Sequence, residues 1–75
     1  DAQIFDLFEQ RLMVAKQIGA YKQEHGLSVL DSSREDVKRD QVKAAVSDEL
    51  EPYALELLEV LMKSAKAIQE TSREL

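Results

Sequence analysis

The sequence lacks the features that most small proteins use to add stability. Its 75 residues include no cysteine and a single histidine, so neither a disulfide nor a Cys/His metal site is expected. One hydrophobic core of this size rarely contributes more than about 3–5 kcal/mol of stability. We therefore expect self-association to supply the rest. The absence of cysteine also suits a reducing compartment, and we expect the protein to be cytoplasmic.

The charge balance and the lack of long apolar runs argue against two classes of partner. Fifteen acidic residues against ten basic residues give a net charge of −5, which disfavours binding to nucleic acid or to an anionic membrane. No apolar run approaches the roughly 18 residues that span a bilayer, and residues 1–3 do not open a signal peptide. We expect a soluble, acidic, intracellular protein.

Only two glycines and one proline interrupt the chain, which favours long helices. Apolar residues recur at helical spacing over residues 1–25, and Gly26 is placed to end this helix in the left-handed conformation. A short connector follows over residues 27–32. No segment alternates with period two, so the sequence predicts an all-α chain that forms a single domain over residues 1–75.

Local signals predict two more helices. The segment Ser32-Ser33-Arg34-Glu35 has the pattern of a capping box, in which a serine caps the helix and the glutamate returns to the cap amide. It predicts a short helix from about residue 33 to residue 46. Pro52 suits the first turn of a third helix, which we expect to reach residue 73. The predicted order is therefore long, short and long.

The first helix carries more apolar surface than one chain can cover. A surface helix needs an apolar stripe of about 100°, and this one is wider. Its apolar residues are Ile4, Phe5, Leu7, Phe8, Leu12, Val14, Ala15 and Ile18. Because the second helix is too short to bury this surface, we expect a second copy of the chain to pack alongside and form a homodimer.

Two cations interrupt the apolar seam of the first helix. Arg11 has apolar neighbours one turn before it and one turn after it. Lys22 follows eleven residues later, which places it only about 20° away around the helix axis. Both side chains therefore point the same way. The structural alternative is that each one buries its stem and extends its charge into water.

Further polar residues complete a candidate pocket. Asp31, Arg34 and Glu35 surround the predicted start of the second helix, and Gln69 follows an apolar seam on the third helix. An inward-facing amide needs hydrogen-bond partners or costs about 1–3 kcal/mol. Together with the two cations of the first helix, these residues would converge on a pocket for a small di-anion.

The sequence offers no equipment for covalent or acid–base catalysis. His25 is the only histidine and lies at a predicted helix end, where a surface role is expected. There is no glycine-rich phosphate loop and no metal-binding motif. An enzyme with this pocket would work through electrostatics and positioning, without metal or cofactor.

In order and spacing, these residues resemble the all-helical chorismate mutases. The likeness runs through the whole chain and rests on Arg11, Gly19-Ala20-Tyr21-Lys22, Asp31-Ser32-Ser33-Arg34-Glu35 and Gln69. It implies a three-helix protomer that intertwines with a second to form an α-helical homodimer. It also implies the Claisen rearrangement of chorismate to prephenate, which leads into phenylalanine and tyrosine biosynthesis.

The resemblance implies a role for each site residue of the long helices. Arg11 would pair with a substrate carboxylate, and Lys22 and Gln69 would hydrogen-bond the ether oxygen as the C–O bond breaks. The family places a further carboxylate-binding arginine on the partner's first helix, at a position about seven residues before Asp1. We expect the first helix to begin upstream of Asp1.

On the second helix, the resemblance implies that Arg34 with Asp31 holds the substrate and that Glu35 accepts a hydrogen bond from its ring hydroxyl. Two other functions stay open at this stage. One is an isochorismate-pyruvate lyase of the same fold, although residues 31–35 resemble the mutases more. The other is a non-catalytic helical module for dimerisation or regulation.

Overall fold

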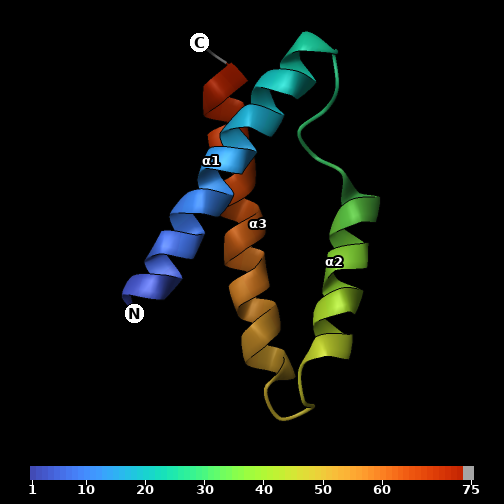
Figure 1. The fold of residues 1–75 in the computed structure, drawn as a ribbon. Helices are drawn as coiled ribbons and strands as arrows, with labels where there is room; N and C mark the ends of the chain where they lie inside the picture. Colours follow the sequence, from blue (N-terminus) through green and yellow to red (C-terminus); the bar gives the residue numbers. More distant parts are fainter. Residues whose placement is uncertain (74–75) are drawn as a thin grey trace. The chain divides into compact units, whose positions relative to one another are not determined.

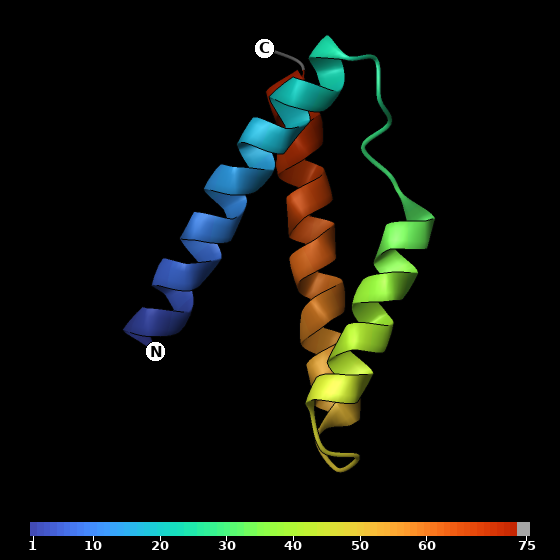
Figure 2. The same cartoon turned by 45° about the vertical axis from the view of Figure 1, so that its right-hand side comes forward.

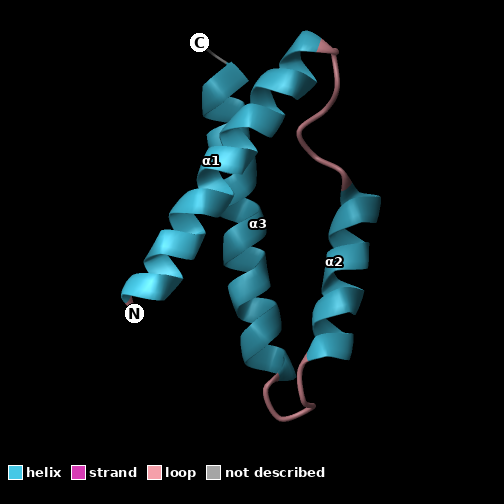
Figure 3. Cartoon of the chain, in the orientation of Figure 1, coloured by secondary structure: helices cyan, strands magenta, loops and turns pink. Residues whose placement is uncertain are grey.

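The computed structural model of the protein describes residues 1–73, and this part of the chain folds into three helices (Figure 1). Helix α1 spans Ala2–Glu24, α2 spans Ser32–Ala45 and α3 spans Glu51–Arg73. Loops alone join them, and no strand occurs among the described residues (Figure 3). The predicted all-α class and the long, short, long order are confirmed. None of the three helices is long and apolar enough to cross a membrane.

Helix α1 ends as its sequence predicts. Gly26 has a φ of 67°, a left-handed conformation that side chains with a Cβ disfavour. The Leu27 N–H donates to the Lys22 carbonyl at 2.7 Å, and the Gly26 N–H donates to the Gln23 carbonyl at 3.2 Å. These two bonds form a Schellman motif, which satisfies carbonyls that the helix leaves unpaired.

The start of α2 differs from the prediction. Asp31 caps the helix, and its Oδ1 accepts a hydrogen bond from the Arg34 backbone N–H at 3.1 Å. The predicted serine cap is therefore wrong, and both Ser32 and Ser33 lie inside the helix. Aspartate caps a helix as well as serine does, and its negative charge also interacts favourably with the helix dipole.

The structure divides into two compact units. The first contains Asp1–Val29 together with α3 from Ser64 onward, and the second is Leu30–Lys63. Within the first unit, the C-terminal part of α1 lies beside the last turns of α3 (Figures 1 and 2). Within the second unit, α2 runs antiparallel to the first part of α3 (Figure 2). Pro52 lies in the first turn of α3, as predicted.

Little of the apolar surface is buried. The buried apolar residues are Ala15, Val29, Leu58 and Met62. Towards the start of α1, by contrast, Ile4, Phe5 and Leu7 are 64%, 68% and 60% exposed. No described side chain is completely buried. The predicted apolar excess of the first helix is therefore present as exposed surface in the single chain.

Candidate active site

Gln69 is a buried amide near the end of α3. The residue is only 8% exposed to solvent, and its side-chain Oε1 has no hydrogen-bond partner among the described residues. The seam that leads to it is buried at Leu58 and Met62, as the spacing predicts. A buried polar atom without a partner is uncommon because it loses its hydration without compensation. This amide therefore has the state expected of a group that a ligand completes.

Gly19 of α1 packs directly against the backbone at Gln69. A Cβ placed on Gly19 would lie 2.8 Å from the Gln69 Cα and 2.9 Å from its carbonyl oxygen. Both separations are too short for a side chain to fit. Sequence reasoning gave Gly19 no role of its own. The available signal was a glycine in a helix interior, which costs up to about 1 kcal/mol relative to alanine and so calls for a packing reason.

Lys22 lies one turn after Gly19 and is partly buried. Its Nζ donates a hydrogen bond at 3.1 Å to the backbone carbonyl of Val29, which is itself 6% exposed. The ammonium is thus held against the connector that follows α1 rather than extended into water. Lys22 and Gln69 both belong to the first unit, where the end of α1 lies beside the last turns of α3.

Arg11 lies on the exposed surface of α1, two turns before Gly19. Its side chain forms no hydrogen bond or ion pair with another residue in the described part of the chain. Its guanidinium offers five N–H donors in a planar fork that matches a carboxylate. The expectation that Arg11 and Lys22 face one pocket stays a prediction.

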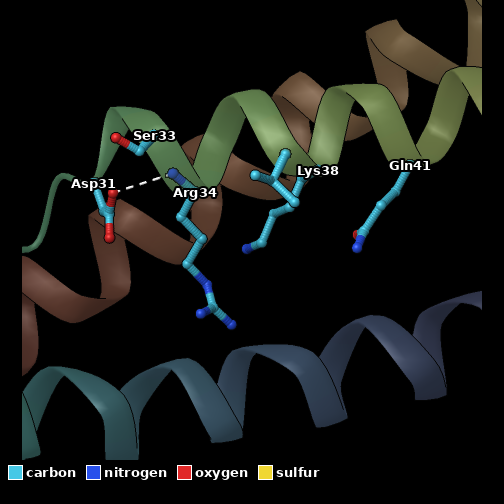
Figure 4. A pocket seen from close by; sticks show the side chains of 6 residues that line it. Asp31, Ser33, Arg34, Lys38 and Gln41 are labelled. Atoms are coloured by element: carbon cyan, nitrogen blue, oxygen red, sulfur yellow. Dashed lines mark hydrogen bonds between the residues drawn. The ribbon is translucent and has the colours of Figure 1, made fainter.

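The start of α2 forms one side of an open pocket of about 460 Å³ within the second unit. Its lining residues are Asp31, Ser33, Arg34, Val37, Lys38 and Gln41 (Figure 4). In Figure 4 the long side chains of Arg34, Lys38 and Gln41 extend from the same side of the helix. Sequence reasoning missed Lys38 and Gln41, although their spacing from Arg34 (i+4 and i+7) is that of one helix face. The pocket is therefore lined by two cations, an amide and a hydroxyl, together with the Asp31 carboxylate.

Glu35 belongs to a charged network that joins α2 and α3. Its Oε1 lies 3.7 Å from Nη2 of Arg39, and the Glu35 side chain is only 16% exposed. Arg39 also contacts Asp36 at 2.9 Å and Glu59 at 2.7 Å. The hydrogen bond that Arg39 donates to Glu59, reinforced by the charges of the Glu59 and Asp36 carboxylates, raises the pKa of Arg39 above its ordinary value. Arg39 therefore stays positive beside Glu35 at every accessible pH.

The six predicted site residues thus fall into two sets. Arg11, Lys22 and Gln69 belong to the first unit, and Asp31, Arg34 and Glu35 belong to the second. The first set combines two cations with a buried amide and suits the binding of an anion, whereas the second set has one cation and two carboxylates. No group of three or more potential metal ligands occurs among the described residues. The convergence of the two sets on one substrate stays a prediction.

Comparison with known proteins adds one finding. The family model described as chorismate mutase type II matches residues 1–70. No curated protein and no solved structure matches the chain significantly. The matched range includes every predicted site residue, from Arg11 on α1 to Gln69 on α3.

Proposed function

The chain belongs to the chorismate mutase type II family, and on that premise we propose that Lys22 and Gln69 are the groups that stabilise its transition state. As a member of this family it is an isomerase that rearranges chorismate to prephenate. The observation that supports the two residues most directly is the buried Gln69 amide with an unpartnered oxygen, in the same unit as a partly buried ammonium.

The rearrangement is unimolecular: one C–O ether bond breaks while one C–C bond forms. No proton is transferred, and no covalent bond to the protein is made. Negative charge grows on the ether oxygen as its bond to carbon breaks, so donors aimed at that oxygen bind the transition state more tightly than the substrate. The Lys22 ammonium and the Gln69 NH₂ group are such donors. Rotation of the amide by 180° exchanges its oxygen with its NH₂ group, which can then face the ligand.

The hydrogen bond from Lys22 to Val29 supports this role. An ammonium has three N–H donors, so the bond to the Val29 carbonyl leaves others for the substrate. The bond also restricts a flexible side chain before the substrate arrives. A donor that is already oriented needs no reorganisation during the reaction, which is what makes electrostatic stabilisation effective.

The remaining site residues are proposed to bind and orient the substrate. Arg11 pairs with one carboxylate through its planar fork. Arg34 holds the substrate from α2, while Asp31 fixes the first turn by accepting the Arg34 backbone N–H. Glu35 accepts a hydrogen bond from the ring hydroxyl. Holding the flexible substrate in its compact reactive conformer lowers the entropic part of the barrier.

The proposed active assembly is an intertwined homodimer in the cytoplasm, with residues 1–75 acting as one catalytic domain. The exposure of Ile4, Phe5 and Leu7 supports a second copy, because apolar surface of this extent is normally covered in a stable protein. The test is the molar mass in solution by light scattering. We expect twice the chain mass for the wild type and a shift toward the monomer for Phe5→Glu. A monomeric wild type would contradict the dimer.

The activity is tested by incubating the purified protein with chorismate and following the loss of the substrate's ultraviolet absorbance. We expect prephenate as the product, whereas pyruvate with salicylate from isochorismate would indicate the lyase. Gln69→Ala should lower kcat by about 10²-fold or more. The matched control is Gln17→Ala, which removes an exposed glutamine of α1 and should leave the rate unchanged. Equal rates for the two variants would refute the role of Gln69.

A further inference from the structure

Gly19 lies where α1 packs against the backbone of α3 at the proposed catalytic amide. It is buried, and a Cβ at this position would meet the Cα, carbonyl oxygen and Cβ of Gln69 at 2.8, 2.9 and 3.1 Å. Two of these three atoms are backbone. A side chain at position 19 therefore cannot be accommodated by a rotamer change of Gln69, because the helix itself has to move.

The size of that movement follows from ordinary packing distances. Carbon atoms in contact are separated by about 3.5–4.0 Å, so the backbone at Gln69 would have to retreat by roughly 0.7 Å or more. Lys22 projects from α1 one turn after Gly19, about 4.5 Å further along the axis. Lys22 stays on α1 while Gln69 moves with α3. The displacement would therefore change the spacing between the two groups proposed to hold the ether oxygen.

We propose that Gly19 is a positioning residue for the chorismate rearrangement: the absence of its side chain sets the distance between α1 and α3, and so places the Gln69 amide relative to the Lys22 ammonium. The inference rests on the proposed roles of Gln69 and Lys22. Gly19 is not itself proposed to touch the substrate. Its contribution is geometric, and a displacement of about 1 Å at a catalytic group costs on the order of 10²-fold in rate.

The first test compares Gly19→Ala with a control that crowds the same helix. Ala15 is 4% exposed and lies one turn before Gly19, so Ala15→Val adds volume to the same face at a different level. We expect Gly19→Ala to lower kcat about 10- to 100-fold with KM changed less than about threefold, because the amide acts mainly in the transition state. Ala15→Val should lower thermal stability with kcat changed less than about threefold. Equal losses of kcat in the two variants would overturn the proposal.

The second test asks whether Gly19 acts through Gln69. In the Gln69→Ala background the amide is already gone, so adding Gly19→Ala should lower kcat no further. The Cα, carbonyl oxygen and Cβ of residue 69 are still present in that background. If Gly19→Ala acted only by disturbing the packing, its loss of kcat would persist in this background and would multiply with the loss caused by Gln69→Ala. Multiplicative losses of kcat would overturn the proposal.

A third measurement is independent of activity, and its wild-type part is independent of the folding of any variant. The side-chain NH₂ group of Gln69 can be observed by ¹⁵N NMR relaxation in the wild type, with the exposed Gln17 as reference. We expect the Gln69 amide to be as restricted as the backbone, and its resonances to shift in Gly19→Ala. An amide as mobile as that of Gln17 would overturn the proposal even if Gly19→Ala failed to fold. If the wild type did not convert chorismate, the proposed function would fail, and this measurement would still decide whether Gly19 places the amide.

Discussion

Arg39 of α2 and Glu59 of α3 form a bidentate ion pair, with 2.7 Å between Nε and Oε1 and 3.3 Å between Nη2 and Oε2. The two parallel bonds fix the orientation of the guanidinium, which a single contact would leave free to rotate. Nη1 of Arg39 donates a third hydrogen bond to Oδ1 of Asp36 at 2.9 Å. The pair joins the two helices of the second unit, and it leaves Nη2 3.7 Å from Glu35.

Replacing Arg39 by alanine should lower the melting temperature at low ionic strength, because three carboxylates lose their common counter-charge. The loss should shrink by at least about half in 1 M NaCl, where the Debye length falls to about 3 Å. Thermal unfolding followed by circular dichroism measures both values. Lys43→Ala removes the same charge from the exposed end of α2 and serves as the control. A loss for Arg39→Ala that does not depend on salt would show that packing, rather than charge, is responsible.

The contribution of Arg39 to the thermal stability of the protein should not change between pH 6 and pH 9. Its pKa is raised, so the stabilisation is fully present below the unfolded-state pKa and is lost only as pH rises through the still higher folded-state value. The pKa values of Arg39 in the unfolded and folded states both lie above this pH window. The melting-temperature difference between wild type and Arg39→Ala, measured across the window, should therefore be constant. A difference that falls steadily toward pH 9 would contradict this assignment.

Replacing Lys22 by alanine should lower kcat/KM by at least about 10²-fold, equivalent to about 3 kcal/mol of transition-state stabilisation. The ammonium is held by the Val29 carbonyl in the first unit, so its loss removes an oriented donor. The control is His25→Ala, three residues later on an exposed surface, where the ring stacks on Tyr21 at 4.0 Å. This control should leave kcat/KM nearly unchanged. Similar losses in the two variants would remove Lys22 from the mechanism.

The rate should be nearly constant between pH 6 and pH 9, because the Gln69 amide is neutral throughout. Gln69→Glu should behave differently, since only a protonated carboxyl can donate to the ether oxygen. At a position that is 8% exposed, burial favours the neutral carboxyl and raises its pKa. Initial rates across pH should therefore rise for Gln69→Glu as pH falls. A wild-type rate that drops steeply above pH 6 would be incompatible with this role.

Replacing Gly26 by alanine should destabilise the protein by about 1–2 kcal/mol. Nothing lies within 4 Å of a Cβ at this position, so the cost comes from the left-handed backbone, with its φ of 67°, rather than from crowding. Urea unfolding measures the change. Gly26→Asn should cost less, because asparagine tolerates this conformation better. Equal costs for the two substitutions would indicate a different cause.

The sequence alone was sufficient for the local features of this protein. The 3–4 spacing of apolar residues, Gly26 and Pro52 predicted three helices and their limits to within one or two residues. These features depend on neighbours in the chain, which a single sequence contains. The error at the start of α2 arose because neighbouring residues offered more than one possible cap. Asp31 and the serines are all good caps, and the backbone geometry that selects among them is not written in residue type.

The candidate site likewise has some residues that the sequence could identify and some contacts that it could not. Arg11, Lys22, Arg34 and Gln69 could be singled out because a charge or an amide in an apolar seam is visible in one helix. Gly19 against Gln69 and Arg39 against Glu59 could not, because each pair joins residues that are 50 and 20 positions apart. Helical periodicity fixes which face a residue occupies but not which residue of another helix lies opposite it. That choice depends on how closely two backbones can approach and which charges then meet, and only the tertiary structure decides it.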